Sequence, residues 1–253
     1  MKDTRIQKAM SDLGICSRRA AEQMIADGRV RVNGRPVSLG DKMDMARDVL
    51  SVDGQTVRPP KKREYKYYML NKPRGYITTV SDERGRKTVM ELIKDIPDRV
   101  YPVGRLDKDS EGMLLFTNDG ELANALTHPS HTVAKMYRVT VHPRAEEEQV
   151  TALANGVVLE DGTRTLPASV RVVADDENRT VMEMSIKEGK NRQIRRMCRA
   201  VGLNVARLSR KSVGAVKLGM LAPGKYRELK PSEVTALKAA ASKSGRKNRA
   251  REG

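Results

Sequence analysis

Apolar residues recur at helical spacing near the N-terminus and then give way to short alternating stretches. Residues 5–13 place their apolar side chains on one face of a helix, and Ser17 is a suitable N-cap for a second helix. Residues 30–32 alternate as a strand does, and the Asn33–Gly34 pair after them is typical of a tight hairpin turn. The pattern therefore predicts a small unit of two helices and short strands over residues 1–58.

A longer succession of strand and helix patterns begins at Tyr65. Most of its candidate strands alternate apolar and polar residues, which is typical of an antiparallel or mixed sheet with one wetter face. The candidate strands are residues 66–70, 113–117, 135–141, 169–173, 181–187 and 203–208, and the candidate helices are residues 89–94, 121–127, 144–154, 192–201 and 232–241. The predicted fold class is α+β.

Two stretches lack the apolar pattern of a packed domain. Residues 59–64 combine prolines with a basic run, which predicts an exposed and fairly stiff linker. Residues 242–253 are basic and have no apolar anchors, which predicts a disordered tail. We therefore expect an N-terminal domain over residues 1–58 and a larger domain over residues 65–241.

The charge of the chain indicates which kind of partner it binds. Its 253 residues include 49 Lys and Arg against 32 Asp and Glu, a net charge of +17 that favours a polyanion such as nucleic acid. No apolar run approaches the roughly 20 residues of a membrane span, and no secretory signal is evident, so we expect a soluble, cytoplasmic protein without a membrane partner. Its two cysteines and three histidines do not have the spacing of a disulfide framework or a metal site.

An acid-rich loop, residues 104–112, precedes an apolar strand. Three interpretations are open for it. A calcium loop would use Asp107, Asp109 and Glu111, but Asn118 stands where a bidentate Glu belongs. A solvated acidic turn is the second interpretation. In the third, basic neighbours hold one selected carboxylate ready to act as a nucleophile or base.

The predicted helix over residues 192–201 has two different faces. One stripe is apolar and suited to packing, whereas the other consists of arginines without interspersed acids. The arginines are Arg192, Arg195, Arg196 and Arg199. Such a stripe favours a surface that faces nucleic acid over a solvated face. Tyr137, which alternates with basic residues along a strand, is suited either to stacking on a base or to packing at a sheet edge.

These segments together resemble the bacterial ribosomal pseudouridine synthases of the RsuA/RluB family. Residues 104–120 are similar to the catalytic motif of that family, residues 188–197 to its second signature, and residues 5–58 to the RNA-binding domain of ribosomal protein S4. The resemblance covers about residues 4–237. Shorter motifs at residues 71–75, 80–86 and 127–129 favour the large-subunit branch of the family over the small-subunit branch. The implied architecture is a small S4-like RNA-binding domain followed by a catalytic domain with a mixed or antiparallel sheet.

The resemblance implies that Asp107 is the catalytic aspartate of uridine isomerisation. This reaction breaks the N1–C1′ bond, rotates the uracil and joins C5 to C1′. It needs neither a group donor nor a redox partner, so no cofactor or metal is expected. The family aspartate either adds covalently or acts as a base on the ribose, and the sequence leaves both routes open.

The resemblance also implies roles for other residues. Tyr137 would stack on the uracil and remove its C5 proton, with Ile186 or Ile194 packed against the ring. Arg195 would pair with Asp107, and Arg105 would fill the gap that the flipped uridine leaves in the RNA. The remaining expected substrate contacts are Lys190, Arg192 and Arg196.

In the N-terminal domain, Arg18 and Arg19 stand in the first turn of the second helix, where positive charge opposes the helix dipole. They are either solvated or compensated by an external anion such as phosphate, which Ser17 and the helix N-terminus would help to bind. The full set of expected RNA contacts in this domain is Arg5, Ser17, Arg18, Arg19, Arg29 and Asn33.

The expected partner is ribosomal RNA, either 23S rRNA or a large-subunit assembly intermediate, bound by a monomer. Two alternatives remain: an enzyme acting on small-subunit rRNA, and a non-catalytic RNA-binding ribosome-assembly factor. The acid-rich loop argues against the second alternative, because a pure polyanion binder gains nothing from carboxylates at its binding face.

Overall fold

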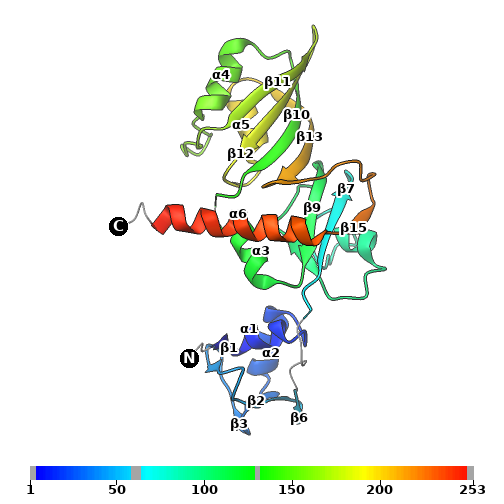
Figure 1. Cartoon of the computed structure of the whole chain (residues 1–253), viewed down its shortest axis with the longest axis vertical. Helices are drawn as coiled ribbons and strands as arrows, with labels where there is room; N and C mark the ends of the chain where they lie inside the picture. The colour runs from blue at the N-terminus through cyan, green and yellow to red at the C-terminus, as the bar shows by residue number, and fades with distance from the viewer. Residues whose placement is uncertain (1–3, 58–63, 129–131, 250–253) are drawn as a thin grey trace. The chain divides into compact units, whose positions relative to one another are not determined.

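The computed structural model describes residues 4–57, 64–128 and 132–249, and the chain divides into two compact units after Tyr65. The predicted linker over residues 59–64 lies almost entirely outside the described residues, as does the end of the predicted tail. Each unit is described by itself (Figure 1).

The described part of the first unit contains two helices and six short strands. The helices are α1 (Ile6–Asp12) and α2 (Arg18–Ala26), and the strands are β1 (Thr4–Arg5), β2 (Val30–Val32), β3 (Arg35–Pro36), β4 (Lys42–Met43), β5 (Leu50–Val52) and β6 (Gln55–Thr56). The Oγ atom of Ser17 accepts a hydrogen bond from the Ala20 N–H at 3.1 Å, so the predicted N-cap is confirmed. Asn33 and Asp53 adopt φ angles of 51° and 52°, each just before a glycine, as the tight turns between these strands require.

The second unit is built on a nine-stranded mixed sheet. Its strands are β7 (Tyr67–Lys72), β8 (Tyr101–Val103), β9 (Glu111–Thr117), β10 (Lys135–His142), β11 (Ser169–Asp175), β12 (Thr180–Ile186), β13 (Asn204–Val213), β14 (Val216–Lys217) and β15 (Tyr226–Glu228). The main path is β11-β12-β10-β13-β9-β7-β15, in which β13 and β9 run parallel and the other neighbours antiparallel. The helices are η1 (Val89–Ile93, a 3-10 helix), α3 (Gly120–Thr127), α4 (Glu147–Asn155), α5 (Gln193–Ala200) and α6 (Pro231–Arg249).

Two hydrophobic cores cover the opposite faces of the central strands. Along β9, Leu114 and Phe116 belong to the core shared with α4 and α5, whereas Met113 and Leu115 belong to the core shared with α3 and α6. Burial on both faces explains why this strand is continuously apolar instead of alternating. On β12, by contrast, buried and half-buried residues alternate strictly.

The C-terminal helix differs from the prediction. We expected a helix ending at residue 241 and a disordered tail from residue 242, but α6 continues to Arg249. Residues 242–249 contain no proline, and their Lys and Arg residues favour helix, so the helical backbone continues beyond the buried Ala241 although Gly245 disfavours it. Among the described residues, no helix is long and apolar enough to cross a membrane.

Candidate active site

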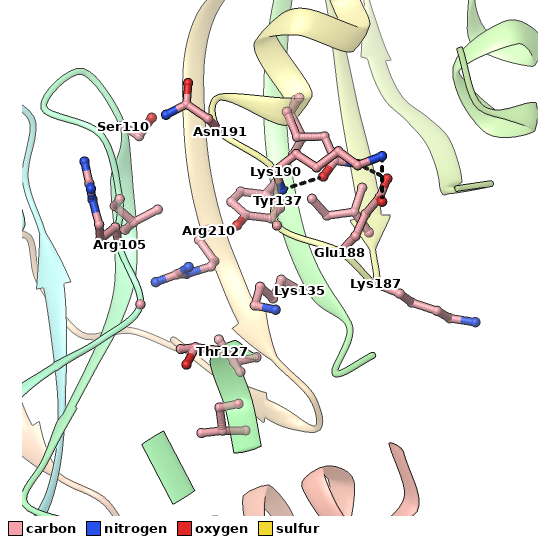
Figure 2. Close-up of a pocket in the computed structure, with 18 of the residues that line it drawn as sticks. Arg105, Ser110, Thr127, Lys135, Tyr137, Lys187, Glu188, Lys190, Asn191 and Arg210 are labelled. Atoms are coloured by element: carbon pink, nitrogen blue, oxygen red, sulfur yellow. Dashed lines mark hydrogen bonds and ion pairs between the residues drawn. The ribbon is translucent and has the colours of Figure 1, made fainter. Parts of the chain in front are cut away.

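A pocket of about 620 Å³ opens in the second unit beside the acid-rich loop. Its lining comes from that loop, from β10 and β13, and from the segment that connects β12 to α5 (Figure 2). Seven of the nine predicted catalytic and substrate-binding residues lie in this lining, namely Arg105, Asp107, Tyr137, Ile186, Lys190, Arg192 and Ile194. The fold thus brings together segments that lie up to about a hundred residues apart in the sequence.

One buried lysine holds the loop that contains Asp107. Lys72, the last residue of β7, is fully buried, and its Nζ donates to the carbonyl oxygens of Pro73 at 3.1 Å, Asp107 at 3.0 Å and Ser110 at 2.7 Å. Burial lowers the pKa of Lys72 to about 8, although three nearby carboxylates act in the opposite direction. The Lys72 ammonium group therefore holds the backbone of this loop in place through three hydrogen bonds.

The segment after Lys72 adds further attachments. Arg74 donates through Nε to the Asp109 carbonyl at 3.0 Å, and the Thr78 Oγ1 donates to the Leu106 carbonyl at 2.7 Å. Together these bonds fix the backbone on both sides of Asp107. The sequence motif over residues 71–75 supported the family resemblance, but it did not indicate these contacts.

Arg192 is the arginine that contacts Asp107. It lies in the left-handed region with φ 48° and ψ 32°, immediately before α5, a conformation that costs on the order of 1 kcal/mol for a residue with a side chain. From there its Nη1 lies 3.4 Å from Asp107 Oδ2 and 3.2 Å from Asp109 Oδ1. The Asp107 carboxylate is partly exposed, so it remains accessible from the pocket.

The expected ion pair between Arg195 and Asp107 is wrong for this structure. Arg195 is mostly buried; its Nη2 lies 3.2 Å from the Asp109 carboxylate, and its Nη1 donates to the Val205 carbonyl at 2.9 Å. Arg195 lies about one helical turn after Arg192. Because Arg192 stands at the start of α5, it is the nearer of the two to Asp107. Burial alone would raise the pKa of Asp109, but the hydrogen bond from Arg192 and the charges of both arginines outweigh it, so the pKa is lowered.

The two arginines should therefore respond differently to substitution. We expect Arg192→Gln to slow isomerisation about tenfold with little change in the free energy of unfolding, because this exposed side chain orients Asp107 through roughly 1–2 kcal/mol of charge-assisted bonding. Arg195→Gln should instead lower the free energy of unfolding by about 1–3 kcal/mol, because it removes a mostly buried guanidinium that joins the Asp109 carboxylate to the Val205 carbonyl. Urea unfolding and single-turnover rates on the same preparations measure both effects, and equal destabilisation by the two substitutions would contradict the assignment.

The arginine stripe of α5 is not free to bind RNA along its whole length. Arg196 is mostly buried and pairs with Glu160 at 2.7 Å and Asp161 at 2.6 Å. The helix has no acidic residues of its own, and Glu160 and Asp161 come from a segment far away in the sequence. The local sequence pattern therefore could not predict these ion pairs. Lys190 lines the pocket but is also engaged, with its Nζ 3.2 Å from Glu188. Arg196 is therefore held in structural ion pairs, and its contact with RNA stays a prediction.

Tyr137 lies on the pocket face of β10 and is nearly buried. Its neighbours across the sheet are Met184 on β12 and Arg210 on β13. Ile186 and Ile194 both belong to the same core cluster as Tyr137, so the structure supports both candidates for packing near the ring. Arg105 is exposed at the pocket margin, as a residue that contacts the rest of the RNA should be.

In the first unit, two of the predicted RNA contacts have structural partners. Arg29 binds Asp53 through two hydrogen bonds of 2.8 and 2.6 Å. The Asn33 amide donates to Asp48 and its oxygen accepts from the Val49 N–H, both at 2.9 Å, so this side chain closes the turn. Arg5, Arg18 and Arg19 are exposed, and Ser17 uses its Oγ to cap its own helix.

The described residues hold no group of three or more His, Cys, Asp or Glu side chains placed to bind a metal ion. Burial raises the pKa of Cys198 to about 12, so this thiol remains protonated and unreactive within the core.

Comparison with known proteins identifies the class to which this fold and pocket belong. The family model described as RNA pseudouridylate synthase matches residues 66–200, and the S4 domain model matches residues 4–46. The chain belongs to the RNA pseudouridylate synthase family. It is thus an enzyme of the isomerase class, in which an S4 domain precedes the synthase domain, as the sequence predicted.

Similar proteins span nearly the whole chain. The ribosomal large subunit pseudouridine synthase B of Bacillus subtilis (strain 168) is 41% identical over 240 residues, which cover 94% of this chain and 96% of that protein. The protein of the same name from Pseudomonas aeruginosa is 38% identical over 237 residues and covers 92% of this chain and 61% of its own length. A crystal structure of a pseudouridylate synthase superposes with a TM-score of 0.66 at 31% identity, covering 92% of this chain and 99% of that one.

Proposed function

We propose that this enzyme converts a specific uridine of large-subunit ribosomal RNA into pseudouridine, with Asp107 as its catalytic residue. The observation that carries the proposal is the fixed loop: Lys72 holds the backbone of Asp107, while the carboxylate opens to a pocket that also contains Tyr137. The names of the Bacillus and Pseudomonas relatives support the large subunit as the source of the substrate.

The geometry supports a division of labour in this reaction. Asp107 assists cleavage of the N1–C1′ bond, by addition or by taking a ribose proton, and Arg192 orients its carboxylate. The ring of Tyr137 supports the uracil while it rotates, because the ring is buried on one side and lines the pocket on the other. After C5 joins C1′, the C5 proton leaves to the Tyr137 oxygen or to water and N1 gains a proton, so the product is an isomer of the substrate.

The test of the function is mapping of pseudouridine in RNA that lacks it. Undermodified 23S and 16S rRNA are treated separately with the protein and then analysed by carbodiimide modification and primer extension. We expect a new stop at one position in 23S rRNA. A stop confined to 16S rRNA would assign the enzyme to the small subunit, and binding without any new stop would favour a non-catalytic assembly factor.

The first unit should increase the affinity for RNA without affecting the rate of isomerisation. We expect the double substitution Arg18→Ala and Arg19→Ala to weaken binding of rRNA about tenfold and to reduce the salt dependence by roughly one phosphate contact per arginine, because exposed arginines release counterions from RNA. The rate at saturating RNA should stay within about twofold. Arg29→Ala is the matched control: its guanidinium is already neutralised by Asp53, so RNA affinity should change little. Filter binding across a salt series decides between these residues.

A further inference from the structure

Two cationic side chains of the pocket have no role in the steps described above. Lys135 on β10 and Arg210 on β13 both line the cavity. Arg210 lies opposite Tyr137 in the strand register, and Lys135 precedes Tyr137 by two residues, so all three side chains share one face of the sheet. Figure 2 shows the Lys135 and Arg210 side chains below the Tyr137 ring in this view, with Lys187 pointing away from them.

Both cations are withdrawn from water. Arg210 is 4% exposed, and its Nε donates to the Met113 carbonyl at 2.7 Å. Lys135 is half-buried, and its Nζ donates to the Val133 carbonyl at 3.2 Å. Burial lowers the pKa of Lys135 to about 8, and the charge of Arg210 adds to the effect. Carbonyl groups satisfy donors but do not neutralise charge, so two like charges lie close together in a poorly solvated place.

Of the other cations in the pocket lining, Arg105 and Lys187 are exposed to water, and two are neutralised by carboxylates. Arg192 faces Asp107 and Asp109, and Lys190 faces Glu188. Within the described part of the chain, no ion pair joins a carboxylate to Lys135 or Arg210. Because such a pair is costly without an anion, the anion that completes it should come from the ligand.

We propose that Lys135 and Arg210 form a phosphate subsite that binds a phosphodiester on one side of the flipped target nucleotide. This inference rests on the proposed function and names the part of the RNA that the second half of the pocket recognises. A phosphate supplies the missing charge and accepts the charge-assisted hydrogen bonds that ammonium and guanidinium groups donate. Anchoring the backbone beside Tyr137 fixes the position of the ribose C1′ with respect to Asp107.

The test combines a protein change with an RNA change. The probes are three synthetic hairpins around the mapped uridine: one unmodified, and two in which the 5′ or the 3′ phosphate of that uridine is a neutral methylphosphonate. We expect Lys135→Met to lower kcat/KM on the unmodified hairpin about 10- to 100-fold, as loss of a buried charged hydrogen bond should. One of the two methylphosphonates should lower the wild-type value by a similar factor, and the two changes together should cost no more than either alone.

The controls separate a specific subsite from general charge. Lys217→Met removes an exposed lysine of β14 outside the pocket lining, and its effect should be small and independent of the methylphosphonate. Arg210→Lys keeps the charge at the subsite and should retain more activity than Lys135→Met. If the effects of Lys135→Met and of each methylphosphonate multiply instead of coinciding, the proposal is overturned.

A second measurement needs no turnover. Uridine 5′-monophosphate, uridine 3′-monophosphate and uridine are titrated into the intact protein and followed by NMR. At least one monophosphate should bind more tightly than uridine, and Lys135→Met should abolish the difference. An enzyme that shows this preference but forms no pseudouridine would contradict the proposed function and leave the phosphate subsite standing, whereas equal binding of all three ligands would overturn the subsite.

Discussion

The Asp107→Asn enzyme should form no detectable pseudouridine while binding rRNA within a few-fold of the wild type. Asparagine keeps the shape of the side chain but removes its negative charge and its ability to act as nucleophile or base. The loop should remain in place, because Lys72 binds the backbone carbonyl of residue 107 and not its side chain. We expect a rate loss of at least about 10⁴-fold, which corresponds to roughly 5–6 kcal/mol of barrier.

Glu111→Gln provides the matched control for this experiment. Glu111 lies at the start of β9, and its carboxylate pairs with Arg207, an exposed side chain. An ion pair with an exposed partner contributes little, and glutamine keeps the shape of the mostly buried Glu111 side chain, so the control should keep most of the rate. Single-turnover assays of the two variants measure the difference. Turnover by Asp107→Asn above a tenth of the wild-type rate would overturn the catalytic assignment.

Replacing Lys72 by methionine should reduce the rate about 100-fold or more without a comparable loss of RNA affinity. The variant leaves three carbonyl oxygens of the loop without their shared donor, and a displacement of about 1 Å in a catalytic group is enough for such a loss. Lys108→Met, at an exposed lysine of the same loop, should have little effect. Thr78→Val loosens the same loop more mildly and should lower the rate in the same direction, so the result does not depend on one variant.

The same lysine should produce a pH dependence of stability. Its pKa is about 8 in the folded protein and 10.5 in an unfolded chain. Between these values the unfolded state binds the additional proton, so this group alone makes the free energy of unfolding rise with pH, by on the order of 3 kcal/mol across the window. Urea unfolding of wild type and Lys72→Met from pH 7 to 10.5 should show a difference that grows with pH in favour of the wild type. A constant difference would show that the lysine does not titrate in this way.

Local patterns predicted the elements but not the contacts between distant ones. The strand over β10, the helix over α5 and the cap at Ser17 follow from periodicity and capping, and the structure confirms them. The partners of the arginines do not follow. Arg196 meets Glu160 and Asp161, and Arg192 reaches Asp107 because of a left-handed backbone at a single residue.

Buried charges were the second type of feature that sequence reasoning missed. Lys72 and Arg210 each lie two residues beyond the predicted strands 66–70 and 203–208, where a lysine or arginine normally indicates an exposed position. Lys72 is buried because the acid-rich loop, residues 104–112, covers it, and Arg210 is buried because β13 pairs in parallel with β9.

The short strands β8, β14 and β15 were missed as well, because two or three residues do not define an alternation.

The parallel seam between β9 and β13 has a consequence for engineering. The register there comprises two residue pairs, and a methyl group on Gly112 would come within 2.3 Å of the Arg210 carbonyl oxygen. Asp107 precedes β9 on one side of this seam, and Tyr137 lies on β10 on the other. The spacing between these two residues is therefore a property of backbone packing at one glycine. Attempts to widen the range of accepted nucleotides should begin with this spacing, because exchanging the lining side chains alone leaves it unchanged.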